Sequence, residues 1–250
     1  MAEVQSGPGK IRLFTDCSGA GVDLASAIAP LVNHGDFHIC GQGIAEDDSG
    51  APVLTSDGLN GVIQLTTTDE DIHCIGFQTG TMFDVGKMAP IVLEARVRPA
   101  EITTGEVFIG FSDVCTDLAI IEGALFHGNT VTITNTASDG CGFLQSSELT
   151  DASDWHAVYN GGTATAVTVS TSLDLDDPQV VGDWQILRLE IDPNGTVRWY
   201  IDGVLKKTVE GAVSTSTDLC AHLLVESKTT AVKTLDVDYF LVEANRDWTV

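Results

Sequence analysis

Pairs of acidic residues two positions apart are the first pattern in this sequence that could carry chemistry. Among these pairs, Glu190/Asp192, Asp174/Asp176 and Asp236/Asp238 qualify as candidates for catalysis. Because residues i and i+2 of a strand point to the same side, such a pair can approach the roughly 5–5.5 Å carboxyl separation of a retaining glycosidase. A glycosidase strand of the Glu-x-Asp-x-x-Glu type needs a second glutamate, but Glu190-Ile191-Asp192 runs into Pro193-Asn194-Gly195. We therefore interpret Glu190/Asp192 and Asp236/Asp238 as solvated residues on the outer faces of strands.

Acidic clusters and His–Cys pairs are the candidates for metal binding. The acidic clusters are Glu46-Asp47-Asp48, Asp69-Glu70-Asp71 and Asp174 with Asp176-Asp177, whose oxygens would suit calcium. None of them has the ligand spacing of an EF-hand loop. His38-x-Cys40 and His73-Cys74 offer imidazole and thiolate ligands, but no second pair at ligand spacing accompanies them. The sequence therefore assigns no metal site and no cofactor.

Motifs for nucleophilic catalysis and phosphate binding are missing from the sequence. There is no G-x-S-x-G element, and Gly41-Gln42-Gly43 lacks the third glycine of a dinucleotide-binding loop. Asn194-Gly195-Thr196 fits a glycosylation sequon, but we interpret it as turn chemistry. We therefore predict a protein that is not an enzyme and has no catalytic residue.

The composition narrows the possible partners. The chain has 250 residues, with 12 Lys+Arg against 36 Asp+Glu and a formal charge of −24. A nucleic-acid binder or a protein that docks on anionic lipid needs a basic surface, so both classes are disfavoured. Hydrophobic residues make up 43% of the chain, which predicts a folded domain rather than a disordered acidic segment.

Cysteine usage and the chain ends suggest a compartment. The six cysteines, Cys17, Cys40, Cys74, Cys115, Cys141 and Cys220, form no C-x-x-C pair, so we predict buried free thiols in a reducing cytoplasm. The N-terminal residues show no basic and apolar signal region, and no stretch approaches the roughly 18 apolar residues of a membrane span. Synthesis in the cytoplasm is therefore the expectation.

Strand patterns dominate the sequence and are clearest between residues 184 and 209. Trp184–Ile191 and Thr196–Ile201 alternate apolar and polar residues around Asp192-Pro193-Asn194-Gly195, and Asp202-Gly203 leads to a third strand, Val204–Val209. Thr234–Glu243 alternates in the same way. The pattern predicts a core-facing set of Leu187, Leu189, Ile191, Val197, Trp199, Ile201, Leu235, Val237, Tyr239 and Leu241.

Short strands are expected along most of the remaining chain, and the only helical signal is a turn or two at Val22–Ala29. The expected strands are Lys10–Phe14, Asp36–Ile44, Gly61–Thr67, Asp71–Phe77, Ile91–Arg98, Glu106–Asp113, Thr130–Asn135, Gly142–Gln145, Trp155–Asn160, Ala164–Thr171 and Leu219–Glu226. This pattern predicts an all-β fold, an antiparallel two-sheet sandwich of the jelly-roll kind. We divide the chain into an N-terminal arm with an acidic loop, residues 1–54, and a sandwich domain, residues 55–250.

Two blocks of motifs carry a family resemblance over roughly residues 55–245. The first contains Gly61–Thr68, Phe77–Gly80, Ile91–Val97 and Glu106–Asp113; the second runs from Trp155–Tyr159 to the W-x-x-L…W-Y-x-D-G block at Trp184–Gly203. Together they resemble the structural proteins of tailed-phage virions that carry a laminin-G or concanavalin-A-like sandwich. The W-Y-x-D-G hairpin is found across that whole superfamily, so the phage assignment depends on the run from Leu65 to Asp113.

The resemblance implies a capsid decoration, or cement, protein on the outer surface of an icosahedral shell. The expected partners are the major capsid protein and further copies of this chain in a homotrimer, with residues 1–35 reaching a neighbour. An outer position also suits the acidic charge, because packaged DNA would repel it. The alternative is a carbohydrate-binding module or adhesin on a virion or tail, with sugar-stacking candidates Trp155, Tyr159, Trp184, Tyr200 and Trp248.

Overall fold

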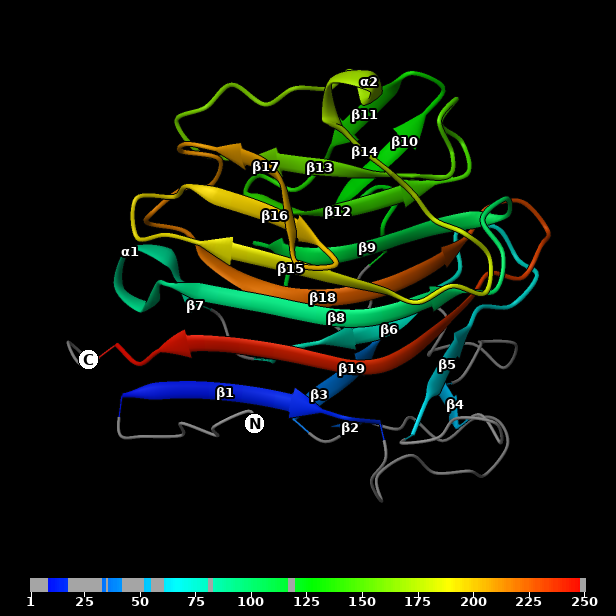
Figure 1. Ribbon diagram of the computed structural model, residues 1–250, viewed down its shortest axis with the longest axis horizontal. Helices are drawn as coiled ribbons and strands as arrows, with labels where there is room; N and C mark the ends of the chain where they lie inside the picture. The colour runs from blue at the N-terminus through cyan, green and yellow to red at the C-terminus, as the bar shows by residue number, and fades with distance from the viewer. Residues whose placement is uncertain are drawn as a thin grey trace.

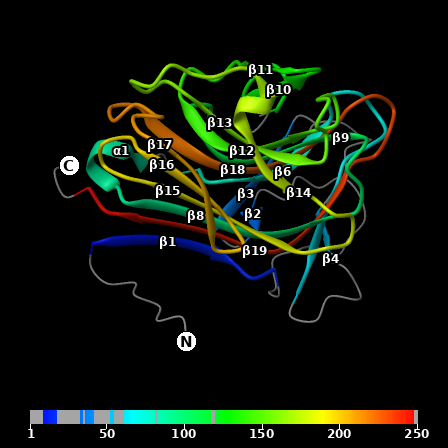
Figure 2. The ribbon, with the colours of Figure 1, turned by 45° about the horizontal axis from the view of Figure 1, so that its top comes forward.

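The computed structural model describes residues 9–17, 33–34, 36–41, 52–54, 61–80, 83–116 and 120–247. Two sheets, in which every strand pair is antiparallel, face each other around one core (Figures 1 and 2). The predicted all-β sandwich is therefore confirmed. Among the described residues there is no helix long and apolar enough to cross a bilayer. The expected helical turn at Val22–Ala29 and the acidic cluster Glu46–Asp48 lie outside the described residues.

Sheet A faces the viewer in Figure 1. Its strand order is β17 (Val204–Val209), β16 (Val197–Ile201), β15 (Gln185–Ile191), β8 (Ile91–Pro99), β19 (Thr234–Asn245), β5 (Ile63–Thr66) and β4 (Pro52–Leu54). Strand β1 (Lys10–Thr15) also pairs with β19, so this part of the expected arm is a strand of the sheet.

Sheet B lies behind sheet A. Its order is β14 (Asp174–Pro178), β13 (Asp154–Asn160), β12 (Gly140–Ser146), β9 (Gly105–Ser112), β18 (Asp218–Ser227), β6 (Cys74–Gln78), β3 (Phe37–Cys40) and β2 (Asn33–His34), with β7 (Phe83–Asp84) also paired to β18. A separate two-stranded hairpin, β10 (Phe126–Asn129) and β11 (Thr132–Asn135), lies toward the top of Figure 1. Within the described ranges there are two helices, each a single turn: α1 (Val85–Met88) and α2 (Ser170–Leu173).

The core forms where the inner faces of the two sheets meet. Trp199 of β16 is fully buried, and its indole nitrogen donates a hydrogen bond of 2.9 Å to the carbonyl of Gly142 on β12. Its ring lies 6.3 Å from that of Tyr159 on β13, so aromatic contacts join the sheets directly. Eight of the ten predicted core residues, Leu187, Leu189, Ile191, Val197, Trp199, Ile201, Leu235 and Val237, are at most 1% exposed.

The prediction is wrong for the other two core residues, Tyr239 and Leu241. The pairing of β19 with β8 shifts register between Val237 and Tyr239. A β-bulge inserts one extra residue and reverses the inward–outward alternation beyond it. Phe240 and Val242 are consequently buried, whereas Tyr239 and Leu241 are half-buried and point outward.

A second expected strand, Ala164–Thr171, does not form. Its first residues run as a loop, Val169 makes only an isolated bridge to Thr132, and α2 begins at Ser170. The neighbouring strand is instead β14, whose sequence Asp-Leu-Asp-Asp-Pro carries no strand signal of its own. Pairing with β13 therefore decides its conformation.

Candidate functional site

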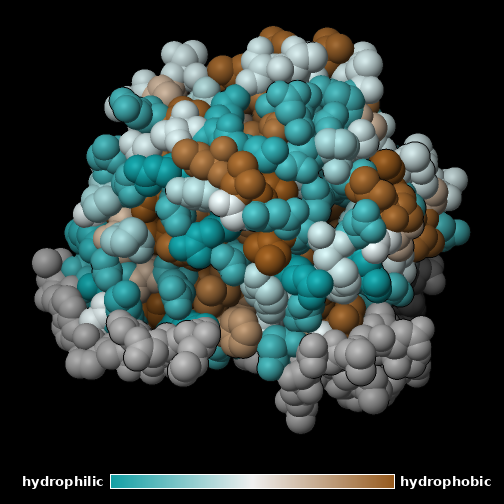
Figure 3. Space-filling model, viewed as in Figure 1, coloured by the Kyte–Doolittle hydropathy of each residue, from teal (hydrophilic) through white to brown (hydrophobic). Residues whose placement is uncertain are grey.

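Five of the six arginines in the chain lie on the outer face of sheet A. We call this surface the arginine face and define it by its three kinds of residue. They are Arg12, Arg96, Arg98, Arg188 and Arg198; the carboxylates Glu94, Glu190, Asp192, Asp236, Asp238 and Glu243; and the rings of Phe14, Trp184, Tyr200 and Tyr239. Strand register creates the pattern, because Arg188 lies opposite Glu94 and Arg98 opposite Asp236. Figure 3 shows this side as largely hydrophilic with scattered apolar patches.

Trp184 lies at one end of the arginine face, in contact with two guanidinium groups. The guanidinium carbons of Arg96 and Arg98 are 4.6 and 4.7 Å from its ring centroid, within the range of cation–π attraction. Arg98 donates hydrogen bonds of 2.9 and 2.6 Å to one oxygen of Asp236. Arg96 donates to Asp238 at 2.6 Å. The half-buried indole is thus held among fixed charges, with part of its surface open to solvent.

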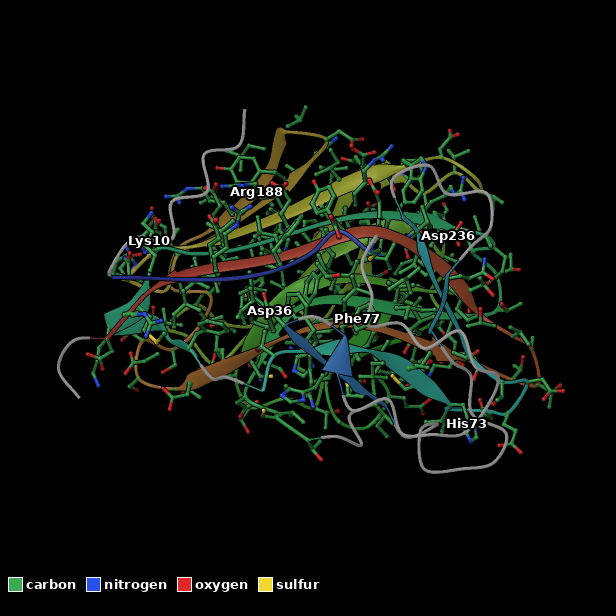
Figure 4. The ribbon with its side chains drawn as sticks, turned by 90° about the horizontal axis from the view of Figure 1, so that it is seen from below. Lys10, Asp36, His73, Phe77, Arg188 and Asp236 are labelled. Carbon is green, nitrogen blue, oxygen red and sulfur yellow. The ribbon has the colours of Figure 1, made fainter. Side chains whose placement is uncertain are left out.

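Arg188 organises the centre of the arginine face. It donates at 2.9 Å to Glu94 on β8 and at 2.8 Å to Glu190 on its own strand. The second oxygens of these carboxylates accept hydrogen bonds from Tyr239 at 2.8 Å and from Tyr200 at 3.2 Å. Figure 4 shows Arg188 and Asp236 on the outward side of the sheet. The result is a row of planar polar groups and rings across four strands.

The charge of the arginine face is nearly balanced, unlike that of the whole chain. Five arginines face six carboxylates, and each of these carboxylates has an arginine partner. The hydrogen bond from Arg198 lowers the pKa of Asp192. A glycosidase acid must instead stay protonated near neutral pH, which requires a less polar environment. The arrangement suits recognition of a neutral polar ligand better than acid catalysis.

A second concentration of polar groups lies between the β10–β11 hairpin and sheet B. We call it the hairpin cluster; it contains Glu106, Glu122, His127, Glu148, Glu226 and Lys228. The Lys228 ammonium is 3.4 Å from Glu106 and 3.0 Å from Glu226, and it also contacts Glu122. Glu106 and Glu226 have no exposed side-chain surface.

Burial and charge shift the pKa values in the hairpin cluster. Burial raises the pKa of Glu226 to about 7 and also raises that of Glu148. Burial by itself would lower the pKa of Lys228, but Glu106 and Glu226 outweigh it and the pKa is raised. A hydrogen bond to Glu106 raises the pKa of His127. The cluster therefore favours cations strongly.

The acid pairs predicted from sequence are held by structural contacts. Glu190 and Asp192 bind Arg188 and Arg198, while Asp236 and Asp238 bind Arg98 and Arg96. In the third pair, Asp174 accepts a hydrogen bond of 2.8 Å from the backbone of Asp176, whose φ is 49°. The interpretation as outer-face residues therefore holds for the two pairs on sheet A, although arginines rather than water satisfy them.

The other sequence candidates are dispersed. Glu70 pairs with His73 at 2.9 Å, Asp71 accepts a backbone hydrogen bond from Thr229, and Asp177 pairs with Lys206 at 2.7 Å. His38 and Cys40 lie on β3, and Cys74 begins β6.

All six cysteines are free thiols; five are buried, but Cys115 is exposed, contrary to the expectation that all are buried. Gly41 approaches the backbone of Cys74, and Asn194–Thr196 forms a turn.

The aromatic candidates divide between core and surface. Trp155 and Tyr159 are buried, at 0% and 5% exposure, so they cannot stack on a sugar. Trp184 and Tyr200 belong to the arginine face, and Trp248 lies outside the described residues.

Sequence reasoning missed the hairpin cluster, whose members come from distant segments. The available signal was a glutamate within an otherwise apolar strand, as at Glu106 and Glu226.

Comparison with known proteins supports the fold. No family model matches the chain, and no curated protein matches its sequence. A protein of unknown function from Shewanella oneidensis MR-1 matches with TM-score 0.57 and 11% identity, over 98% of this chain and 90% of its own. The Emp47p carbohydrate recognition domain matches with TM-score 0.52 and 10% identity, over 82% and 93%. The cellulose-induced protein Cip1 matches with TM-score 0.51 and 12% identity, over 83% and 90%. The chain thus has a lectin-type sandwich fold.

Proposed function

We propose that the protein is a carbohydrate-binding module without catalytic activity, and that the arginine face binds the glycan. The observation that carries the proposal is the half-buried Trp184 beside Arg96 and Arg98, with Asp236 and Asp238 fixed next to these arginines. An indole can lie against the apolar face of a sugar ring, while guanidinium and carboxylate groups bind hydroxyls around it. The fold shared with a carbohydrate recognition domain is consistent with this proposal.

Preorganisation supports the same choice of surface. Each arginine of the Trp184 end is already held by a carboxylate, and Gln64 donates a further hydrogen bond of 2.9 Å to Asp236. Groups fixed before binding lose little conformational entropy when a ligand arrives. A neutral glycan also fits a nearly neutral surface, whereas the chain as a whole carries −24.

A glycan array followed by titration calorimetry tests the proposal. We expect a ligand whose affinity falls at least about tenfold in Trp184→Ala, a loss on the scale of the roughly 1–3 kcal/mol that a nucleic-acid base gains by stacking on an aromatic side chain. Val131→Ala is the control, since Val131 is 50% exposed and lies outside the arginine face. Equal affinity of both variants for the glycan, or no glycan binding by the full chain, would overturn the proposal.

Capsid decoration is the second candidate, and the open edge of sheet A favours it. On the edge strand β17, Val204 is 57% and Leu205 is 49% exposed. An apolar edge of this kind can be covered by a neighbouring copy or by a shell subunit. Light scattering should then give a trimer, and the protein should co-sediment with purified capsids. A monomer that ignores capsids and binds a glycan would leave only the first candidate.

A further inference from the structure

We propose that the hairpin cluster binds one divalent transition-metal ion of the Zn²⁺ class through His127, Glu148 and Glu106. One ligand atom from each of these residues lies within 4.8 Å of the others. The three residues come from β10, from the turn after β12 and from β9, so the ion would join the hairpin to sheet B. This site is independent of the arginine face and of the proposed glycan binding.

The imidazole of His127 is the first argument for a metal ion. Its Nδ1 is 3.2 Å from Glu106, and its Nε2 is 3.6 Å from Glu148 and 3.9 Å from Glu122. One imidazole nitrogen can bind a metal ion in place of its proton, so this nitrogen and the neighbouring carboxylates form a donor set of the kind that zinc takes. Tetrahedral zinc, with bonds of about 2.0–2.2 Å, places its ligand atoms roughly 3.4 Å apart.

The charge balance is the second argument. The hairpin cluster holds four carboxyl groups against the Lys228 ammonium, so at full ionisation even a protonated His127 would leave an excess of two negative charges. Two of the carboxylates, Glu106 and Glu226, are fully buried, where an uncompensated charge is costly. Lys228 shows that the cluster already accommodates one cation. A divalent ion supplies the missing charge.

The arrangement also indicates how an ion enters and which ion is preferred. Glu148 and Glu122 are 44% and 36% exposed, whereas Glu106 forms the floor. Glu106 also accepts a hydrogen bond of 3.0 Å from the backbone N–H of Gly128. In metal sites, hydrogen bonds of this kind hold a ligating carboxylate in the orientation that the metal requires. A nitrogen ligand with carboxylates suits zinc or cobalt, whereas calcium prefers oxygen ligands only.

Metal titration of the full chain after chelator treatment and dialysis tests the proposal. We expect calorimetry to show one Zn²⁺ per chain, and Co²⁺ to give the visible absorption of a four-coordinate site. Glu148→Gln and His127→Ala should each weaken binding at least about tenfold, the scale on which contacts around a metal change affinity. Calcium in excess should not displace the ion.

The matched control is Glu210→Gln, which removes an exposed carboxylate outside the cluster. It should bind Zn²⁺ as the unaltered chain does. Thermal melts monitored by circular dichroism establish that the variants fold, and Glu148→Gln keeps the test valid because this side chain is 44% exposed. Binding that is absent in the full chain, or that is unchanged in folded Glu148→Gln, would overturn the proposal.

Discussion

The outer faces of the two sheets use the same chemical groups in opposite surroundings. On sheet A, Arg188 and its partner Glu94 are 36% and 23% exposed. On sheet B, Lys228 and Glu106 are 3% and 0% exposed because the hairpin covers them. Ion pairs near water contribute little to stability, whereas breaking a buried pair leaves a charge without compensation. This difference in burial predicts that removing a charged side chain lowers the free energy of unfolding more on sheet B than on sheet A.

Removing the buried cation should have the largest effect. Lys228→Met keeps most of the side-chain stem but leaves Glu106 and Glu226 facing each other without an ammonium group. We expect the free energy of unfolding to fall by about 3–5 kcal/mol, the usual cost of removing one partner of a buried pair. Urea denaturation at neutral pH measures it. A loss below about 1 kcal/mol would remove the proposed contrast between the two faces.

Acidification should weaken the covered face through His222. Burial lowers the pKa of His222 to about 4 from its ordinary value of 6.5, and its Nε2 lies 3.0 Å from the hydroxyl of Ser112. A base with a lowered folded pKa stabilises the fold above the unfolded value and loses that contribution as the pH falls toward 4. The difference between the unfolded and folded pKa values of His222 corresponds to a contribution on the order of 3 kcal/mol to the free energy of unfolding.

The measurement compares the free energy of unfolding of the full chain with that of His222→Gln from pH 7 to pH 4. The difference between them should shrink as the pH falls, because only the unaltered chain loses the His222 contribution. Glu226 acts in the opposite direction, since its pKa is raised to about 7, but it is common to both proteins. A difference that is independent of pH would show that His222 does not resist protonation.

Gly128→Ala should disturb the hairpin by a smaller amount. A Cβ at this position would lie 2.6 Å from the Ser146 hydroxyl and 2.7 Å from a side-chain carbon of Leu149. We expect a loss of about 1–3 kcal/mol, as for other overpacked sites, together with weaker metal binding, because the backbone of Gly128 orients Glu106. Gly182→Ala is the comparison: no atom lies within 4 Å of its new Cβ, so any loss there comes from the positive φ of 86°, which Gly128 does not have.

The smallest effect is expected on the arginine face. Arg198→Met removes a pair with Asp192 whose side chains are 30% and 32% exposed. An exposed pair of this kind contributes roughly 0–1 kcal/mol, so urea denaturation should scarcely separate the variant from the unaltered chain. A loss comparable to that of Lys228→Met would show that the arginine face acts as one cooperative network.

The same contrast explains what could be predicted from the sequence. Strand β8 is buried on alternate residues, so its period of two is visible in Ile91–Pro99. Strand β9 is buried at all eight positions because both of its faces are covered, and only its apolar run could be recognised. The extra residue near Asp238 could not be predicted, since nothing in a local pattern specifies a bulge.

The candidate sites were harder to predict than the fold. Arg96 and Arg98 alternate along one strand, but their contact with Trp184 depends on a residue more than eighty positions away. Glu106, His127 and Glu148 belong to three separate segments with no spacing in common. Such residues come together only when the sheets and the hairpin have formed. Their spacing along the chain therefore does not match any metal-binding sequence motif.

Strand β19 has a consequence for how the chain is made. It pairs with β8, β5 and β1, which are all synthesised before it, and β1 contacts it across more than two hundred residues. Sheet A therefore cannot close until residue 245 has left the ribosome. Until then one edge of β8 and one edge of β5 stay open, and unpaired strand edges in a nascent chain favour aggregation. Completion of sheet A therefore waits for the last of its strands, β19.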